Sequence, residues 1–518
     1  MLGTVERQGS LLGVDSLLAP LFEGDDDSFY ARLAAGGDEV ISDEDFASCY
    51  AADRGRPSIP PSLLMKAVLC QIREDVSDRE AARRAAKDLD WKRALGLEAD
   101  EVPFHHTTLS VFRSRLLVND ADGVVLRRTI ERAVGAGLLG RRVLAIADST
   151  GVMGAAAVVD TYELIRQAIA RLVAASGGPS GLPRRLRKRA RAYSGGKAQI
   201  DWSDAAARGE ELGRLVTTAR ELLAATEGSE EAAEAWELLG RIVDQDTEEN
   251  PQDDAGPAIR QGVAPQRVVS VVDPDMRHGR KTSSRRIDGY KTHLLTDHDS
   301  ELVLGVSVTP ANAPDGPEAA PLVEGARRAG VPVREVLGDT AYGDGDTRVA
   351  VEEAGAKMTA KAQPPATTGK FPKTEFRIDP DEPSATCPAG HTTTRHGWSR
   401  DHKGRRVMIM KFGAELCGSC PLRERCTTSS QGHSLTLNFH ERRLQAARAQ
   451  QTRPSTRKKL RRRAIIERKI AEGKRHGMGK ARYRGIRKVL LQERLTAGLL
   501  NLKRLFTLLD TPKGPQTA

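Results

Sequence analysis

The stretch RRVLAIADST, residues 141–150, is the part of the sequence that says most about the fold. It is a short β-rich apolar run that ends close to an acidic residue, Asp148. A second stretch, VREVLGDTAYG at 333–343, has the same form and carries Asp339. Open α/β sheets place their functional groups at the carboxyl ends of buried strands. If these two strands are neighbours, their carboxylates meet at one edge of the sheet.

The segments around these two stretches alternate between strand and helix patterns. Strands are predicted for RVVSVVD (267–273), GYKTHLLTD (289–297) and ELVLGVSVTP (301–310), and a helix is predicted for 315–329. Residues 160–245 have a helical pattern that separates the first strand from the others. This order of elements predicts an α/β core that is interrupted by insertions.

The length of 518 residues is too great for a single hydrophobic core, since domains average roughly 150 residues. We therefore divide the chain into four parts by composition and pattern. These are a helical N-terminal domain with possible DNA binding (1–135), the first part of the core (141–360) with a helical insertion at about 155–265, a Cys-rich insertion (361–435), and basic C-terminal helices that complete the core (436–510).

Composition places the chain among soluble proteins. Hydrophobic residues make up 39% of the sequence, and the mean hydropathy is -0.44. No segment approaches the ~18 unbroken apolar residues that a membrane span needs. The N-terminus also lacks the pattern of a signal peptide, so we expect a cytoplasmic protein.

Charge is unevenly distributed along the chain. The whole sequence has 80 Lys and Arg against 70 Asp and Glu, whereas residues 441–504 alone have 22 basic and 4 acidic side chains. A positive end of this kind on a mildly acidic body favours binding to a polyanion, because Lys and Arg displace counterions from phosphates. The alternative is a solvated basic helix or a disordered tail. Apolar periodicity within the run, including Ile466 and Ile470, indicates that it packs and favours nucleic acid.

The two aspartates have two explanations. Each can cap a turn through its own backbone, which is the ordinary role of a single Asp at such a position. A carboxylate pair, however, needs a shared proton or a cation, and hard oxygen ligands favour Mg²⁺ or Mn²⁺. Two such ions can activate an attacking oxygen and stabilise a leaving one in phosphoryl transfer. The second explanation requires a third carboxylate from elsewhere in the chain.

Four cysteines form a separate signal. Cys387 opens CPAGH, while Cys417, Cys420 and Cys426 lie in CGSCPLRERC. A C-x2-C pair with two further cysteines predicts a tetrahedral Zn²⁺ site, with His391 as an alternative ligand. Free or redox-active thiols are the other interpretation, because the first gap is long. Disulfides do not suit a cytosolic chain.

Several of these segments, in order, resemble the catalytic segments of DDE transposases of bacterial insertion sequences. They are IADST, GDTAYGDGDTR and the basic run RRRAIIERKIAEGK, and GRPSIPPSLLMKAVL, VSDRE and TTLSVFRSRL resemble the N-terminal domain of those enzymes. In many relatives the third catalytic segment has Tyr, Arg, Glu and Lys at fixed spacings. Here Arg463, Glu467 and Lys474 match, but Leu460 stands at the Tyr position, so another group such as Tyr483 would have to replace it.

The resemblance implies an RNase H-like core, a mixed sheet flanked by helices, with a catalytic triad of Asp148, Asp339 and Glu467. It implies that these three side chains bind two Mg²⁺ or Mn²⁺ ions. The C-terminal segment ARYRGIRKVLLQERLTAGLLNLKRL (481–505) also resembles the end of such transposases. The cations expected to contact DNA are Arg463, Lys474, Arg482, Arg484 and Lys488.

Other basic positions are candidate DNA contacts on the evidence of the residues alone. The patch PRRLRKRARAY (183–193) is one candidate for contact with DNA. Lys281, Lys291 and His293 are further candidates, although a solvated strand edge is the interpretation that their local pattern favours.

The expected function is therefore that of a DNA transposase. It would bind the terminal inverted repeats of its element, cleave a phosphodiester to free a 3′-OH, and join that hydroxyl to target DNA. Binding two element ends implies a homo-oligomer, located in the cytoplasm and on the nucleoid when bound to DNA. The alternatives are a catalytically inactive DNA-binding regulator derived from a transposase, and a metal-dependent nuclease. The sequence has no Walker motif and no G-x-S-x-G elbow, so it does not support nucleotide hydrolysis or serine chemistry.

Overall fold

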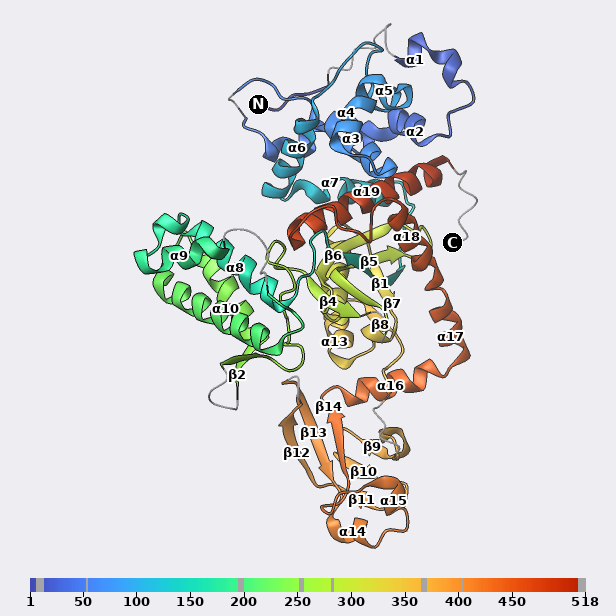
Figure 1. Cartoon of the computed structure of the whole chain (residues 1–518). Coiled ribbons are helices and arrows are strands. Elements are labelled where there is room, and N and C mark those ends of the chain that lie inside the picture. Colours follow the sequence, from blue (N-terminus) through green and yellow to red (C-terminus); the bar gives the residue numbers. More distant parts are fainter. Residues whose placement is uncertain are drawn as a thin grey trace.

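The computed structural model describes residues 1–5, 14–52, 55–193, 200–250, 256–280, 284–364, 370–401 and 404–510. A mixed sheet with helices on it occupies the centre, and a helical module covers one end (Figure 1). A helical bundle lies beside the sheet, and a small β-rich lobe extends from the opposite end. Lys281, one of the candidate DNA contacts, lies outside the described residues.

The central sheet contains antiparallel and parallel neighbours. Its order is β6-β5-β1-β7-β8. Strand β4 also pairs with β5, on the edge of β5 that faces away from β1, where it precedes β6 along that edge. The pairs β6–β5 and β5–β1 are antiparallel, whereas β1–β7 and β7–β8 are parallel. The strands are β1 (Val143–Met153), β4 (Arg277–Arg280), β5 (Arg286–Asp297), β6 (Val303–Pro310), β7 (Val333–Leu337) and β8 (Lys357–Thr359). The predicted α/β character of the core with a mixed sheet is confirmed.

Helices pack on both faces of this sheet. On one face lie α12 (Ala319–Arg328) and α13 (Gly345–Glu353), and a Cβ added at Gly305 of β6 would meet Leu322 of α12 at 3.0 Å. On the other face lie α7 (Val124–Gly135), α18 (Ala464–Arg475) and α19 (Ile486–Asp510). Between them, Ala145, Ile146 and Ala147 of β1 are fully buried. Small side chains in this strand allow the helices to approach closely.

The helical N-terminal module has its own hydrophobic core, which includes Trp91 and Phe112. Its link to the rest of the chain is partly electrostatic, since the buried Asp122 accepts hydrogen bonds from Arg487 (2.8 Å) and Arg494 (3.2 Å) of α19. Burial alone would raise the pKa of Asp122, but these two arginines outweigh it and lower that pKa. The main helices are α2 (Phe29–Gly36), α3 (Pro61–Glu74), α4 (Asp78–Lys87), α5 (Leu89–Leu95) and α6 (His106–Val118).

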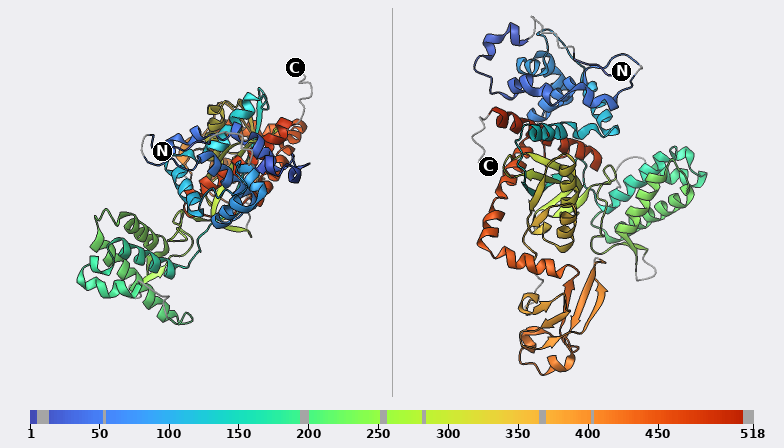
Figure 2. Two further views of the ribbon diagram at one scale, coloured as in Figure 1. Left: turned by 90° about the horizontal axis from the view of Figure 1, so that it is seen from above. Right: turned by 180° about the vertical axis from the view of Figure 1, so that it is seen from behind.

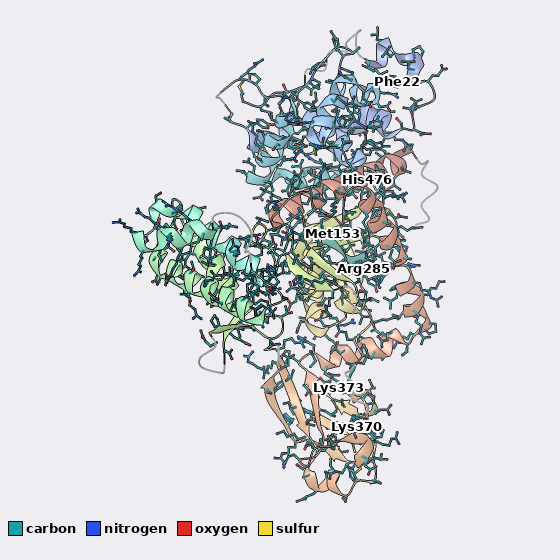
Figure 3. The ribbon with its side chains drawn as sticks, viewed as in Figure 1. Phe22, Met153, Arg285, Lys370, Lys373 and His476 are labelled. Atoms are coloured by element: carbon teal, nitrogen blue, oxygen red, sulfur yellow. The ribbon has the colours of Figure 1, made fainter. Side chains whose placement is uncertain are left out.

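The helical bundle follows directly from β1. Met153, at the end of β1, marks the point where the chain leaves the sheet (Figure 3). The bundle consists of α8 (Thr161–Ala175), α9 (Arg184–Tyr193), α10 (Ala205–Thr226) and α11 (Ala233–Asp246), and ends in the hairpin of β2 (Thr247–Glu249) and β3 (Pro257–Ile259). Its core is separate from that of the sheet.

The strand predicted for residues 267–273 is wrong. Val268, Val269 and Val271 are buried and Val272 is exposed, but the backbone of this segment pairs with no strand among the described residues. Instead, the side-chain amide of Gln245 donates to the carbonyl of Val268 at 3.0 Å, and the Val268 N–H donates to that side chain at 2.8 Å. Burial of valines in an extended connection imitates the pattern of a strand.

The Cys-rich lobe contains two small antiparallel sheets, and Lys370 and Lys373 lie on it (Figure 3). Its elements are β9 (Arg377–Asp379), β10 (Ser384–Thr386), β11 (Thr392–Thr393), β12 (His396–Arg400), β13 (Arg406–Lys411), α14 (Ala414–Gly418), α15 (Arg423–Cys426) and β14 (Ser434–Asn438). The chain then returns to the core through α16 (Glu441–Gln451) and α17 (Pro454–Arg461), which run along the side of the molecule to α18 (Figures 1 and 2). In the described ranges, no helix is both long and apolar enough to cross a membrane.

A buried carboxyl group in α19 should make the stability of the fold depend on pH. Glu493 is fully buried, and burial raises its pKa to about 8. Between the ordinary pKa of about 4.5 and a pKa of about 8, the folded chain holds a proton that the unfolded chain releases, so stability falls as pH rises through this range. Replacing Glu493 by Gln should remove this dependence. The melting temperature of Glu493→Gln should exceed that of the parent by a margin that grows up to about pH 8.

Glu472→Gln is the matched control. Burial alone would raise the pKa of Glu472, but Lys469 and Lys503 outweigh it and lower that pKa, so this carboxylate stabilises the fold above its unfolded pKa. Its replacement should lower the melting temperature at neutral pH. Parallel melting curves for the parent and Glu493→Gln across pH would contradict the assignment of a proton to Glu493.

Candidate catalytic site

The register of β1 and β7 brings Asp148 and Asp339 together. Ile146 pairs with Leu337 at the last position of this parallel ladder, and each aspartate follows two residues later. β7 ends there, but β1 continues to Met153. The sequence predicted that Asp148 lies at the end of its strand, but the structure places it within β1. The aspartates still coincide, because the neighbouring strand stops.

Helix α18 brings a third carboxylate to the same place. Ile466, Lys469 and Gly473 are buried against the core, whereas Glu467 and Lys474 lie on the exposed side of the helix. Glu467 thus faces a pocket of about 680 Å³ at the edge of the sheet. The carboxylates that line this pocket are Asp148, Asp315, Asp339 and Glu467, and its cations are Arg280, Lys291, Arg463 and Lys474.

Asp148 is held by two donors. The Ser149 N–H donates to one carboxylate oxygen at 2.8 Å, and the Arg463 guanidinium lies 3.3 Å from the other. Burial raises the pKa of Asp148 above its ordinary value, and the charges of Asp339 and Asp315 act in the same direction. The Ser149 N–H and Arg463 lower it. A cation would stabilise the charged form of Asp148, whose pKa the neighbouring carboxylates raise.

Asp339 both caps a turn and lines the pocket. One of its carboxylate oxygens accepts a hydrogen bond from the Ala341 N–H at 2.8 Å. The two interpretations of this residue in the sequence are therefore compatible, because the cap occupies only one oxygen. Asp344, the next acidic residue, caps α13 through the Thr347 N–H at 2.9 Å and does not line the pocket.

Sequence reasoning missed Asp315 as a member of the site. Its carboxylate accepts a hydrogen bond from Lys291 at 2.5 Å and one from the Ser149 hydroxyl at 2.9 Å. Lys291, from β5, therefore points into the pocket and not to a solvated strand edge. In sequence, Asp315 is an ordinary polar residue before a helix. Asp315 follows β6, and the pairing of β6 with β5 and of β5 with β1 brings it next to Asp148.

A buried tyrosine also lies beneath the carboxylates. Tyr342 is fully buried, and its hydroxyl has no hydrogen-bond partner within the described ranges. Burial raises the pKa of Tyr342, as do the charges of Asp315, Asp148 and Asp339. Tyr483, which the sequence offered in place of the tyrosine missing at position 460, packs against the N-terminal module instead.

The expected DNA contacts lie in different environments. Arg463 and Lys474 line the pocket. Arg484 and Lys488 are exposed beyond it, whereas Arg482 donates to the carbonyl of Val76 in the N-terminal module at 2.8 Å. His293 is a poor candidate for contact with DNA, because it is fully buried and its ring hydrogen-bonds to Thr309 at 2.8 Å.

The four cysteines of the Cys-rich lobe line one small cavity of about 20 Å³. The pKa of Cys426 is raised by burial and by the charges of Cys417, Cys387 and Cys420. The His433 N–H donates to the sulfur of Cys417 at 3.4 Å, an interaction that also suits a metal-bound thiolate. His391 lines the same cavity. A cavity of this size accommodates about one atom the size of a water oxygen or a metal ion.

The carboxylates of the pocket and the four cysteines of the lobe are suitable metal ligands by type, but neither group has the side-chain geometry of a closed metal site. No three His, Cys, Asp or Glu side chains in the described ranges are arranged so that they could hold a metal ion as they stand. In the pocket at the sheet edge, the Arg463 guanidinium lies 3.3 Å from a carboxylate oxygen of Asp148.

Two comparisons with known families identify the kind of protein. Residues 386–506 match a family model described as "Transposase DDE domain", and residues 22–115 match one described as "Transposase domain (DUF772)". Both matches support assignment of the chain to the DDE transposases of insertion sequences. The chain is a DNA transposase, an enzyme that cleaves DNA and transfers the cut strand, and DNA is its substrate.

The DDE match contains Glu467 and the four cysteines of the lobe, but neither Asp148 nor Asp339. DDE transposases generally use divalent metal ions. No curated protein and no solved structure gives a significant match to the chain.

Removing the guanidinium beside Asp148 should change the pH dependence of metal binding. Arg463 lowers the pKa of Asp148, so Arg463→Gln should raise that pKa further. If Asp148 binds metal as a carboxylate, the pH midpoint for Mn²⁺ binding, measured by calorimetry, should move upward. Arg461→Gln removes an equal charge from an exposed position in the same basic run and should leave the midpoint unchanged. Equal shifts in both variants would indicate a general effect of charge.

Proposed function

We propose that the central sheet is an RNase H-like core in which Asp148, Asp339 and Glu467 form the catalytic triad. The observation that carries this proposal is the register of β1 and β7, which places both aspartates two residues beyond a shared pair. The sheet order, with three antiparallel strands followed by two parallel ones, supports it. Glu467 arrives from a helix on the same pocket.

The three carboxylates would bind two Mg²⁺ or Mn²⁺ ions, since oxygen ligands suit these hard cations. Bound ions would supply activation of the attacking oxygen and stabilisation of the leaving oxygen in phosphoryl transfer. Asp148 and Asp339 fit this role because their negative charges are unfavourable where they lie. The charge of Asp339 raises the pKa of Asp148, and the charges of both aspartates raise the pKa of Tyr342. A cation between them would remove this repulsion.

The cations of the pocket would hold the DNA strand. Lys474 lies on the same exposed side of α18 as Glu467, and Arg463 begins that helix. When metal takes over the neutralisation of Asp148, the Arg463 guanidinium becomes available to a phosphate. Lys291 is oriented by Asp315 and lies at the other wall of the pocket. Phosphate groups would thus be bound from two sides, and the reacting bond would be positioned over the carboxylates.

In this proposal, the enzyme cleaves at the inverted repeats that end its element and joins the freed 3′-OH to target DNA. Engagement of two element ends requires at least two active sites, which favours a homo-oligomer. The enzyme would act in the cytoplasm, on nucleoid DNA. A metal-dependent nuclease or an inactive regulator would share the DNA-binding surface, but the regulator would not need three converging carboxylates.

Substitution of each triad member should abolish both reactions. Asp148→Asn, Asp339→Asn and Glu467→Gln should each lower cleavage and strand transfer by more than about 100-fold, because losing a metal ligand costs more than losing its outer-shell partner. The measurement uses labelled DNA that carries the element's own ends, with Mg²⁺ or Mn²⁺. Cleavage without joining in the parent protein would instead indicate a nuclease.

Asp344→Asn is the control for this series. Asp344 lies five residues after Asp339 and caps α13, and Asn caps helices as well as Asp does. The variant should keep both fold and activity. If any triad variant matched Asp344→Asn in strand transfer, that residue would have no place in the triad.

We also propose that Cys387, Cys417, Cys420 and Cys426 bind one structural Zn²⁺. The four sulfurs line a cavity of about 20 Å³ and influence the pKa of one of them. The lobe has few buried apolar side chains around this cavity, so a bound metal would contribute much of its stability. The zinc would be structural, because four protein ligands leave no open position for a substrate.

Metal analysis of the purified chain should find about one Zn per protein. Cys417→Ser should lower this value and should make the lobe more sensitive to protease, since the metal holds its two sheets together. Cys49→Ala removes a thiol from the N-terminal module and should leave the zinc content unchanged. A zinc content near zero in the parent protein, prepared without chelator, would refute the site.

A further inference from the structure

Helix α9 in the bundle exposes a dense row of cations. Leu186 and Ala190 are buried and fix the side of the helix that packs. Arg184, Lys188 and Arg191 follow at intervals of four and three residues, so they lie along the opposite side. All three are exposed, as is the adjacent Arg185. Figure 1 shows α9 at the margin of the bundle, away from the central sheet.

These cations differ from others in the same bundle in having no acidic partner. Arg171 pairs with Glu234 at 2.5 Å, Arg220 pairs with Glu249 at 2.6 Å, and Arg214 pairs with Glu211. In the ranges that the structure describes, no hydrogen bond or ion pair involves the side chains of Arg184, Arg185, Lys188 or Arg191. Their side chains are therefore available to an anion from outside the chain.

The row is also unfavourable for the helix itself. Arg184 and Lys188 are like charges four residues apart, which destabilises a helix. Arg184 and Arg185 lie in the first turn, where the helix dipole disfavours cations, and α9 has no acidic residue there. A bound polyanion would relieve both effects. The arrangement therefore costs stability in isolation, and a negatively charged partner would compensate for this cost.

We propose that this row of α9, formed by Arg184, Arg185, Lys188 and Arg191, binds the phosphate backbone of duplex DNA outside the catalytic pocket. From Arg184 to Arg191 the helix rises by about 10 Å. Duplex DNA carries one charge per ~1.7 Å of its axis, hence about six phosphates over this length. Four cations thus meet a comparable density of negative charge. Contacts of this kind are independent of base sequence.

The proposal depends on DNA as the substrate but not on the triad, so it is tested by binding without divalent metal. The variant Arg184→Gln, Lys188→Gln, Arg191→Gln removes three unpaired charges. The control Arg171→Gln, Arg214→Gln, Arg220→Gln removes three paired charges from the same bundle. Both variants have the same net charge, and Gln has a helix propensity close to that of Arg, so circular dichroism should show equal helix content. The probe is a duplex of unrelated sequence, titrated at a series of salt concentrations.

Each lost phosphate contact lowers the slope of log K against log salt by about 0.9, so the first variant should lose between about 2 and 3. Relative to the parent, its affinity deficit should therefore shrink by roughly 40-fold between about 50 mM and 200 mM salt. The control should keep the parent slope. Equal slopes in all three proteins would overturn the proposal, as would equal losses in both variants. The first variant could keep the parent's salt slope for duplex binding and lose binding to phosphatidylserine vesicles. That result would assign the row to a membrane surface instead.

Discussion

The structure depends on the burial of helix α19 between two hydrophobic cores. Leu495, Leu499 and Leu502 belong to the core of the N-terminal module, whereas Ala497 belongs to that of the sheet. Polar groups fix the position of the helix as well, because the side-chain amide of Asn501 accepts from the Val303 N–H at 2.7 Å and donates to its carbonyl at 2.8 Å. The two regions share a helix, and neither core is complete without it.

The geometry of the carboxylate pocket also depends on the segment that leads into this shared helix. The segment before α19 is joined to β1 by backbone hydrogen bonds, from Met153 to Gly479 (2.9 Å) and from Ala481 to Met153 (2.8 Å). Helix α18 is thus fixed at its C-terminal end to the strand that carries Asp148. His476, marked in Figure 3, hydrogen-bonds to the Arg73 carbonyl of the N-terminal module at 3.0 Å and anchors the same corner. Glu467 faces the pocket because both anchors set the rotation of α18.

The sequence predicted the features that depend on local pattern and failed where only topology decides. The two β-rich runs, the four cysteines and the basic helix could be read directly, because each has its own composition and spacing. Asp315 could not, because nothing near it in sequence indicates that β5 lies beside β1. The valines of 267–273 led to a wrong prediction of a strand. Three of them, Val268, Val269 and Val271, are buried in an extended connection, and this gives the same apolar pattern as a strand. The α/β core was predictable, but the polar environment of Asp148 was not.

The order of the segments along the chain also affects when the active site can exist. Asp148 is made early, the helical bundle and the Cys-rich lobe follow, and the helix that unites both cores is synthesised after all of them. During translation, the bundle can fold on its own core while the carboxylates remain apart, whereas the core of the N-terminal module still lacks the side chains of α19. If α9 binds DNA as proposed, an incomplete polypeptide would hold DNA before the three carboxylates have come together. Assembly by the last long helix would then separate attachment to a chromosome from damage to it.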